Sequence, residues 1–279
     1  MNRRLVSEGL DRLGITAEGT RLEQLERYLN EIELWNPRYG LVHASGDELV
    51  VKHLLDSLAA LPVIEELLGR PLPAGGTRPA AADEPFPARE APAGGLQSVP
   101  IGGDSSVTAG GAGTVQSCGT GLCDVGSGAG FPGIPLAMFL PHVPVTLIES
   151  SGRRVSFLKN AGALLGLTNL TVRESRVEDA VRTGTRPEET PADPAGAGFA
   201  VVTFRAFKPL DAGLLATLGR LTAPGGWVAA YKGRRERLQA ELDSLDGLVA
   251  ELRIVPIAVP FLDEERHLVL LRPKPDLLR

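Results

Sequence analysis

Apolar and polar positions alternate along this chain with two different periods, and each period predicts its own kind of element. Residues 21–35 carry apolar side chains at helical spacing with charged residues between them, which predicts an amphipathic helix. The apolar positions of this helix are Leu22, Leu25, Leu29 and Ile32. Asn36-Pro37 predicts the end of the helix, because a residue that precedes proline disfavours helical backbone.

A second helix is predicted over residues 47–68, where Ser45 and Glu48 have the spacing of a capping box. The two helices together predict a small N-terminal helical region over residues 1–70, packed on the rest of the protein.

After residue 121 the pattern changes to short apolar segments, which are typical of buried strands. These segments are 122–126, 143–150, 169–175, 199–206, 225–233, 252–259 and 266–273. Helical patterns lie between the first five, so we expect an α/β fold with a doubly wound, mostly parallel seven-stranded sheet. Only residues 260–265 separate the last two segments, which is too short for a crossover helix, so the sheet should end in an antiparallel hairpin.

Composition divides the chain into three parts. In residues 71–121, 27 of 51 residues are Pro, Gly or Ala, and large apolar residues are almost absent. Such a segment buries too little apolar surface to offset the entropy of ordering, so it is predicted to be a disordered insertion. A second loop of the same kind covers 182–198, and the main domain is expected to span 122–279.

One segment carries a chemical signal. Gly126, Gly128 and Gly130 follow the first predicted strand, in the place where open α/β sheets bind nucleotide-like ligands. Glu149 ends the second strand 23 residues after Gly126, close to the spacing of about 20 for an acid that accepts from ribose hydroxyls. Phe131 occupies the position of the third glycine of a dinucleotide fingerprint, where it would crowd a pyrophosphate. The pattern therefore favours S-adenosylmethionine over a nicotinamide cofactor, with a tight turn that binds nothing as the alternative.

Bulk properties exclude several classes of protein. The chain has 279 residues, 43% of them hydrophobic and 23% charged, with a net charge of −5. No apolar run approaches the roughly 18 residues of a membrane span, and no signal peptide is recognisable, so a cytoplasmic location is expected. Two cysteines and four histidines show no metal-ligand spacing, so a metal-free chemistry is expected.

Five stretches together resemble one known family. "DVGSGAGFPGIPLAM", "HLLDSL", "SRVED", "RAF" and "ERHLVLL" are similar to the glucose-inhibited division protein B family, and the similarity covers 20–66 and 122–272. This resemblance implies a Rossmann-like class I methyltransferase fold. It also implies methyl transfer from S-adenosylmethionine to the N7 atom of a guanine in 16S ribosomal RNA. Carried over by motif, the expected cofactor-binding residues include Gly126, Phe131, Val177, Glu178 and Arg205.

The implied reaction needs no catalytic acid or base in this chain. Guanine N7 carries a lone pair and no proton, so we expect a direct in-line displacement that depends on positioning. Basic and polar residues around the site are the candidates to face RNA: His53, Asp56, Ser57, Arg153, Arg154, Lys159, Lys232 and Arg266. For the first three, packing of the N-terminal helices on the sheet is an equally good interpretation, and each basic residue alone also fits a solvated surface.

Several rival functions stay open at this point. The chain is alternatively a methyltransferase for a small molecule or protein, a nicotinamide dehydrogenase, or a non-catalytic ribosome assembly factor. The expected partner is 16S ribosomal RNA, either bare or in the small subunit, with no membrane and no stable protein partner.

Overall fold

The computed structural model describes residues 2–17, 19–69, 120–182, 198–206, 208–245 and 247–278. The predicted insertion at 71–121 and the loop at 182–198 fall almost wholly outside these residues, so both stay predictions. The N-terminal region holds α1 (Arg3–Arg12), α2 (Gly19–Tyr39), α3 (Gly46–Leu49), the π-helical turn η1 (Val50–Leu55), α4 (Asp56–Ala59) and α5 (Leu61–Leu67).

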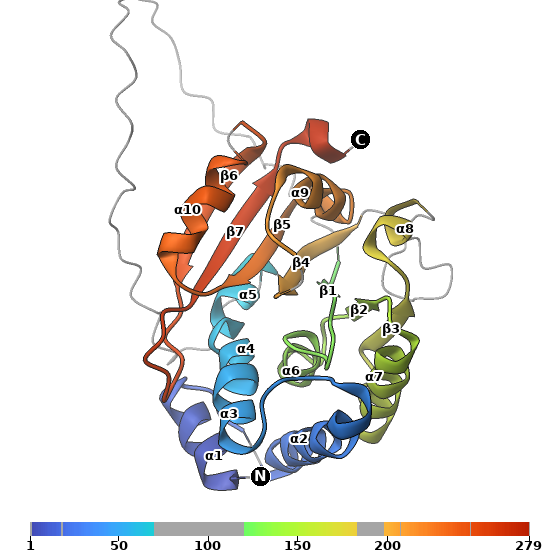
Figure 1. The fold of residues 1–279 in the computed structure, drawn as a ribbon, viewed down its shortest axis with the longest axis vertical. Helices are drawn as coiled ribbons and strands as arrows, with labels where there is room; N and C mark the ends of the chain where they lie inside the picture. The colour runs from blue at the N-terminus through green and yellow to red at the C-terminus, as the bar shows by residue number, and fades with distance from the viewer. Residues whose placement is uncertain are drawn as a thin grey trace, which may run out of the picture.

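The described residues form a seven-stranded sheet in the order β3-β2-β1-β4-β5-β7-β6 (Figure 1). Its strands are β1 (Leu122–Val125), β2 (Val145–Glu149), β3 (Leu170–Glu174), β4 (Phe199–Arg205), β5 (Thr222–Lys232), β6 (Val249–Pro256) and β7 (His267–Pro273). Strands β1 to β5 pair in parallel, and β7 pairs antiparallel with both β5 and β6. The expected α/β fold with its terminal hairpin is confirmed.

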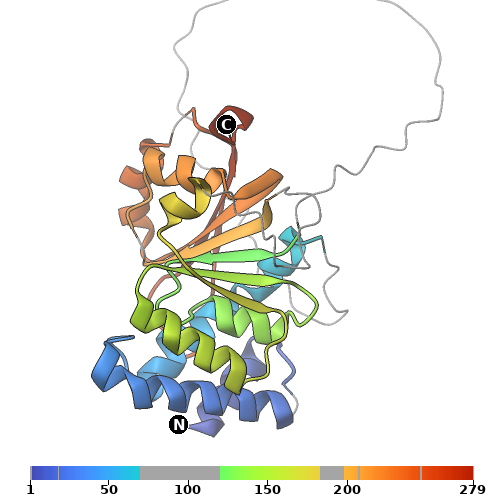
Figure 2. The same ribbon diagram turned by 90° about the vertical axis from the view of Figure 1, so that its right-hand side faces the viewer.

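Helices cover both faces of the sheet, as Figure 2 shows edge-on. One face packs against α6 (Gly133–Phe139), α7 (Gly152–Leu164) and the N-terminal helices, which share a single hydrophobic core with it. The other face packs against α8 (Val177–Arg182), α9 (Ala212–Gly219) and α10 (Arg235–Asp243) in a second core. The chain ends in a short 3₁₀ turn, η2 (Pro275–Leu278).

Two local predictions in the N-terminal region are wrong, and one helix was missed. Helix α2 does not end at Asn36-Pro37 but continues to Tyr39, because Asn36 exchanges hydrogen bonds with Val42 and fixes the loop only after another turn. Helix α1 was not anticipated. The capping box at Ser45 does not form, since its side chain makes no capping hydrogen bond and Gly46 N–H instead donates to the Glu33 carboxylate at 3.0 Å.

The second predicted helix is interrupted. Its middle is the π-helical turn η1, whose hydrogen bonds span five residues instead of four. This turn contains His53 and leads directly into Asp56 at the start of α4. Such turns occur frequently at functional sites, and this one lies against the carboxyl end of β4, where Arg205 contacts it.

Candidate active site

A cavity of about 520 Å³ opens at the carboxyl ends of β1, β2, β3 and β4. Its lining residues are Val125, Gly126, Ile148, Glu149, Ser150, Arg154, Ser175, Arg176, Val177, Glu178, Ala206 and Lys208. Apolar walls come from the strands, and two carboxylates and three cations stand around them. This first cavity lies at the edge at which open α/β sheets bind ligands.

The glycine-rich turn forms the floor beside the first cavity. Gly126, Gly128 and Gly130 all have positive φ, at 69°, 57° and 96°. Gly130 also needs its small size, because a Cβ there would lie 2.6 Å from Ile134 Cδ1 and 3.0 Å from the Tyr28 hydroxyl. The glycines therefore shape the backbone, and of the three only Gly126 lines the first cavity itself.

Glu149 is an acid of the first cavity whose carboxylate is held by backbone N–H groups. Its carboxylate accepts hydrogen bonds from Gly128 N–H at 3.0 Å and Ser151 N–H at 2.9 Å, one on each oxygen. Arg154 approaches to 3.9 Å. Each carboxylate oxygen has a second lone pair, so the group is held in place and can still accept from a ligand hydroxyl.

The opposite wall is formed by the start of α8. Val177 is buried, whereas the Glu178 side chain is half-exposed and pairs with Lys208 Nζ at 2.7 Å. The Lys208 hydrogen bond is the largest influence on the Glu178 carboxyl, and it lowers its pKa from the usual value. Glu178 and Lys208 thus bridge the segments that follow β3 and β4 at the rim of the first cavity.

Phe131 does not take the role that the spacing suggested. Its side chain is buried and packs against Tyr28 and His53, with ring centroids 5.2 Å and 5.3 Å away, and it is not part of the first-cavity lining. The argument that this ring excludes a pyrophosphate is therefore wrong. Phe131 instead anchors the N-terminal helices to the glycine turn.

Asp124 is a buried acid that the sequence reasoning missed. Its Oδ2 accepts from Gly133 N–H at 3.1 Å and its Oδ1 accepts from the Thr203 hydroxyl at 3.3 Å. Burial raises the pKa of this carboxyl to about 6, although the Gly133 hydrogen bond opposes the shift. Asp124 ties β1 to β4 and to the start of α6. The available signal was an acid within an otherwise apolar strand, two residues before the first turn glycine.

A second cavity of about 640 Å³ adjoins the first, because Ala206 lines both. Its remaining lining residues are Lys52, His53, Asp56, Arg205, Tyr231, Lys232, Gly233, Arg234, Leu238, Glu241, Ile257, Glu264, Arg266 and His267. Four predicted RNA-facing residues therefore meet here: His53, Asp56, Lys232 and Arg266. Arg205, which the family motif assigned to the cofactor, lines this second cavity and not the first.

An ion-pair network organises the second cavity. The buried Asp56 carboxylate pairs with Arg205 Nη1 at 2.8 Å and Arg266 Nε at 3.2 Å. Arg205 Nη2 lies 2.8 Å from His53 Nδ1, and Lys232 pairs with Glu241 at 2.5 Å. Arg205 thus connects the end of β4 to the N-terminal helices.

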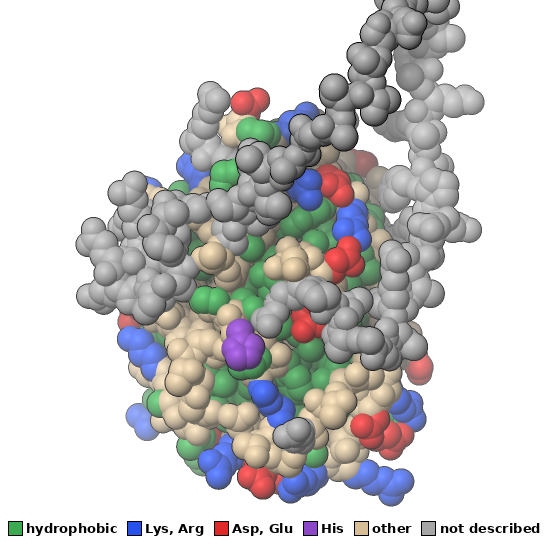
Figure 3. Space-filling view, turned by 180° about the vertical axis from the view of Figure 1, so that it is seen from behind, with side chains coloured by type: hydrophobic (Ala, Val, Ile, Leu, Met, Phe, Trp, Pro, Cys, Tyr) green, Lys and Arg blue, Asp and Glu red, His purple; other side chains and the backbone are tan. Residues whose placement is uncertain are grey.

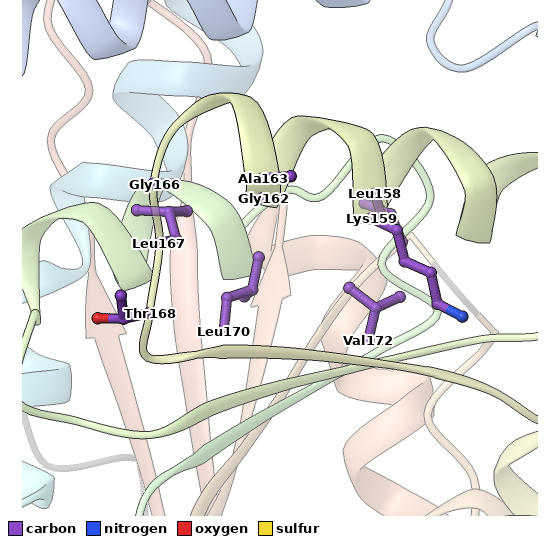
Figure 4. A pocket seen from close by; sticks show the side chains of 9 residues that line it. All are labelled: Leu158, Lys159, Gly162, Ala163, Gly166, Leu167, Thr168, Leu170 and Val172. Atoms are coloured by element: carbon purple, nitrogen blue, oxygen red, sulfur yellow. The ribbon is translucent and has the colours of Figure 1, made fainter.

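Four other candidates lie elsewhere. Ser57 is fully buried, and its hydroxyl donates to the His53 carbonyl, so it cannot face RNA at the surface. Arg154 lines the first cavity, while Arg153 is exposed on α7. Lys159 lines a separate groove of about 360 Å³ between α7 and β3, so its proximity to the first cavity was wrongly predicted. Figure 4 shows Lys159 beside Val172 at one end of this groove.

Side chains of both charges lie on the face opposite to that seen in Figure 1. The face in Figure 3 shows acidic and basic side chains interspersed among apolar ones in its visible part. In the described part of the chain, no helix combines the length and apolarity that a membrane crossing requires. The same residues bring no three His, Cys, Asp or Glu side chains together as a metal site.

The strand order, the antiparallel β7 and the ligand-sized cavity at the carboxyl ends define a Rossmann-like methyltransferase fold. The methyltransferase domain of METTL16 shares this fold, with a TM-score of 0.50 and 12% identity over 91% of this chain and 79% of that one. Sequence similarity identifies the family within this fold. The chain belongs to the rRNA small subunit methyltransferase G family, GidB, whose model matches residues 109–269.

Relatives from distant bacteria agree with this membership. A ribosomal RNA small subunit methyltransferase G from Cupriavidus necator is 34% identical over 275 residues, covering 96% of this chain and 94% of that protein. One from Treponema pallidum is 32% identical over 250 residues, covering 88% and 82%. The resemblance to the glucose-inhibited division protein B family is confirmed, whereas the ligand contacts of individual residues stay predictions.

Proposed function

We propose that this protein transfers a methyl group from S-adenosylmethionine to the N7 atom of a guanine in 16S ribosomal RNA. The observation that carries the proposal is the pairing of two adjoining cavities in a chain of this family. One is lined by apolar walls and a fixed carboxylate, and the other by five Lys and Arg side chains together with two histidines and three acids. We place the reaction in the cytoplasm, on 16S RNA either bare or within the small subunit.

The residues of the first cavity suit an adenosyl group. Glu149 is oriented by two backbone N–H groups and keeps lone pairs for ribose hydroxyls. Val125, Ile148 and Val177 give apolar surface for a purine ring, and the backbone and carboxylate of Glu178 stand at its edge. When bound, the sulfonium compound supplies an activated methyl group.

The second cavity would receive the base. Because N7 is already nucleophilic and unprotonated, the chain has only to hold it in line with the methyl group, and no general base is required. Lys232, Arg234 and Arg266 line this cavity and suit phosphate contacts that position the RNA.

The test is methyl transfer itself. Protein is incubated with labelled S-adenosylmethionine and small-subunit RNA lacking the modification, either bare or in assembled subunits, and the labelled base is mapped. We expect label on the N7 of one guanine. Label on another atom or on protein would replace the substrate class, and no transfer to either RNA form would favour a non-catalytic role.

A further inference from the structure

The protonation pattern of the His53 ring is set by its neighbour. Arg205 Nη2 lies 2.8 Å from His53 Nδ1. A guanidinium has only donors, so Nδ1 must be the acceptor and carry no proton. Burial and the Arg205 charge lower the pKa of His53 to about 4, which keeps the ring neutral near pH 7. The ring proton therefore sits on Nε2.

Arg205 itself has little freedom to release the ring. Its Nη1 donates to the Asp56 carboxylate at 2.8 Å and lies 3.3 Å and 3.4 Å from the carbonyls of Lys52 and His53. Its guanidinium carbon lies 5.3 Å from the centre of the Phe131 ring, which also packs against His53. His53 is thus held as a fixed donor.

The Nε2–H of His53 is the part of the ring left for a ligand. No hydrogen bond from this atom occurs within the described residues, and His53 lines the second cavity. Building on the proposed function, we propose that His53 Nε2–H donates to O6 of the target guanine. Arg205 is then the positioning residue that fixes the His53 tautomer.

The chemistry of the purine edge supports this assignment. Guanine presents N7 and O6 side by side as two acceptors, whereas adenine presents N7 beside an amino donor. A donor next to the bound N7 therefore accepts guanine and opposes adenine. A neutral histidine without the Arg205 contact can exchange tautomers and pair with either base, so the contact supplies the selectivity.

The positions of the cavities agree with this arrangement. The first and second cavities meet at Ala206, so a base in the second can direct N7 toward the first. Its O6 then lies on the same edge, within the second cavity that His53 lines. The volume of about 640 Å³ is within the range of cavities that bind small ligands.

Two near-isosteric variants separate the functions of the ring. In His53→Asn the amide reaches only to the Nδ1 position, so it can accept from Arg205 but loses the donor at Nε2. In His53→Gln the amide reaches the Nε2 position and keeps that donor. Both are compared with wild type on small-subunit RNA that carries either guanine or 2-aminopurine, which keeps N7 but lacks O6, at the mapped position.

We expect wild type to lose about 10- to 100-fold in kcat/KM on 2-aminopurine, the value of one good base contact. His53→Asn should lose a similar factor on guanine and no longer discriminate between the two RNAs, while His53→Gln keeps most of the discrimination. Calorimetry should show unchanged S-adenosylmethionine affinity for both variants. If His53→Asn discriminates as wild type does, this inference fails alone. If wild type transfers no methyl group to guanine RNA, the proposed function fails with it.

Imidazole ¹⁵N NMR gives an independent readout that needs no RNA. We expect a pyridine-type Nδ1 and a pyrrole-type Nε2 for His53, assigned by the signals lost in His53→Asn. Arg205→Met, which removes the donor facing Nδ1, should produce a mixture of tautomers. A pyrrole-type Nδ1 in wild type would overturn the assignment.

Discussion

Asp56 joins two arginines from distant parts of the chain, and its replacement should be costly. Its carboxylate is 5% exposed and pairs with Arg205, which is 14% exposed, and Arg266, which is 20% exposed. Removing one partner of a buried ion pair costs about 3–5 kcal/mol, because the remaining charge is left uncompensated. Water reaches both guanidinium groups in part, so we expect Asp56→Asn to lower the free energy of unfolding by about 2–4 kcal/mol.

The measurement is urea unfolding followed by circular dichroism and tryptophan fluorescence, with coincident curves as the check on two-state behaviour. Arg253→Ala is the matched control, because it removes an exposed pair with Glu66 at 3.4 Å and should cost no more than about 1 kcal/mol. If Asp56→Asn changes stability no more than this control does, the network contributes only surface electrostatics and the reasoning is refuted.

Other consequences can be measured on single variants. Glu149→Gln should weaken S-adenosylmethionine binding by about 1–3 kcal/mol in calorimetry, and unchanged affinity would reject its ribose contact. The pKa of His53 is lowered from 6.5 to about 4 in the folded protein, so the unfolded chain binds more protons between these pH values. As the pH rises from 4 to 6.5, the free energy of unfolding of wild type should therefore gain up to about 3 kcal/mol relative to that of His53→Gln. The pH effect of Asp124 has the opposite sign, because its pKa is raised to about 6 in the folded protein. As the pH rises from 4 to 6, wild type should lose stability relative to Asp124→Asn. For either residue, a stability profile of the variant that runs parallel to that of wild type over this pH range would contradict the pKa shift. Gly133→Ala should destabilise by about 1–3 kcal/mol, since its Cβ would lie 2.3 Å from Leu147 Cδ2, whereas Gly213→Ala in α9 should leave the Tm unchanged or higher.

The fold was predictable because its signals are local. Each apolar segment after residue 121 has the length of a strand, and the short link before β7 leaves only an antiparallel connection. Glu149 could be placed at the first cavity because strand ends and turn glycines fix its position within the βαβ unit. The π-helical turn was not predictable from a 3.6-residue period, and helix α1 was not anticipated.

The missed contacts join residues far apart in sequence. Arg205 and Asp56 are 149 residues apart, and no local pattern reveals that they meet. The prediction for Lys159 was wrong for the opposite reason. This residue is close to Glu149 in sequence, but it lies about two turns along α7, which begins at Gly152. Sequence spacing locates a side chain within its element, while the packing of elements decides which cavity it reaches.

The two cavities also differ in which part of the chain builds them. The first is lined entirely by residues 125–208, whereas the second needs Lys52, His53 and Asp56 from the N-terminal helices. Tyr231 fixes these helices through a 3.1 Å hydrogen bond to the Ser57 carbonyl, and Tyr28 does so through a 2.7 Å bond to Ala129 in the glycine turn. The sheet alone therefore supplies the cofactor side of the proposed reaction. In the proposed reaction, selection of the base would depend on how the N-terminal helices are held against the sheet.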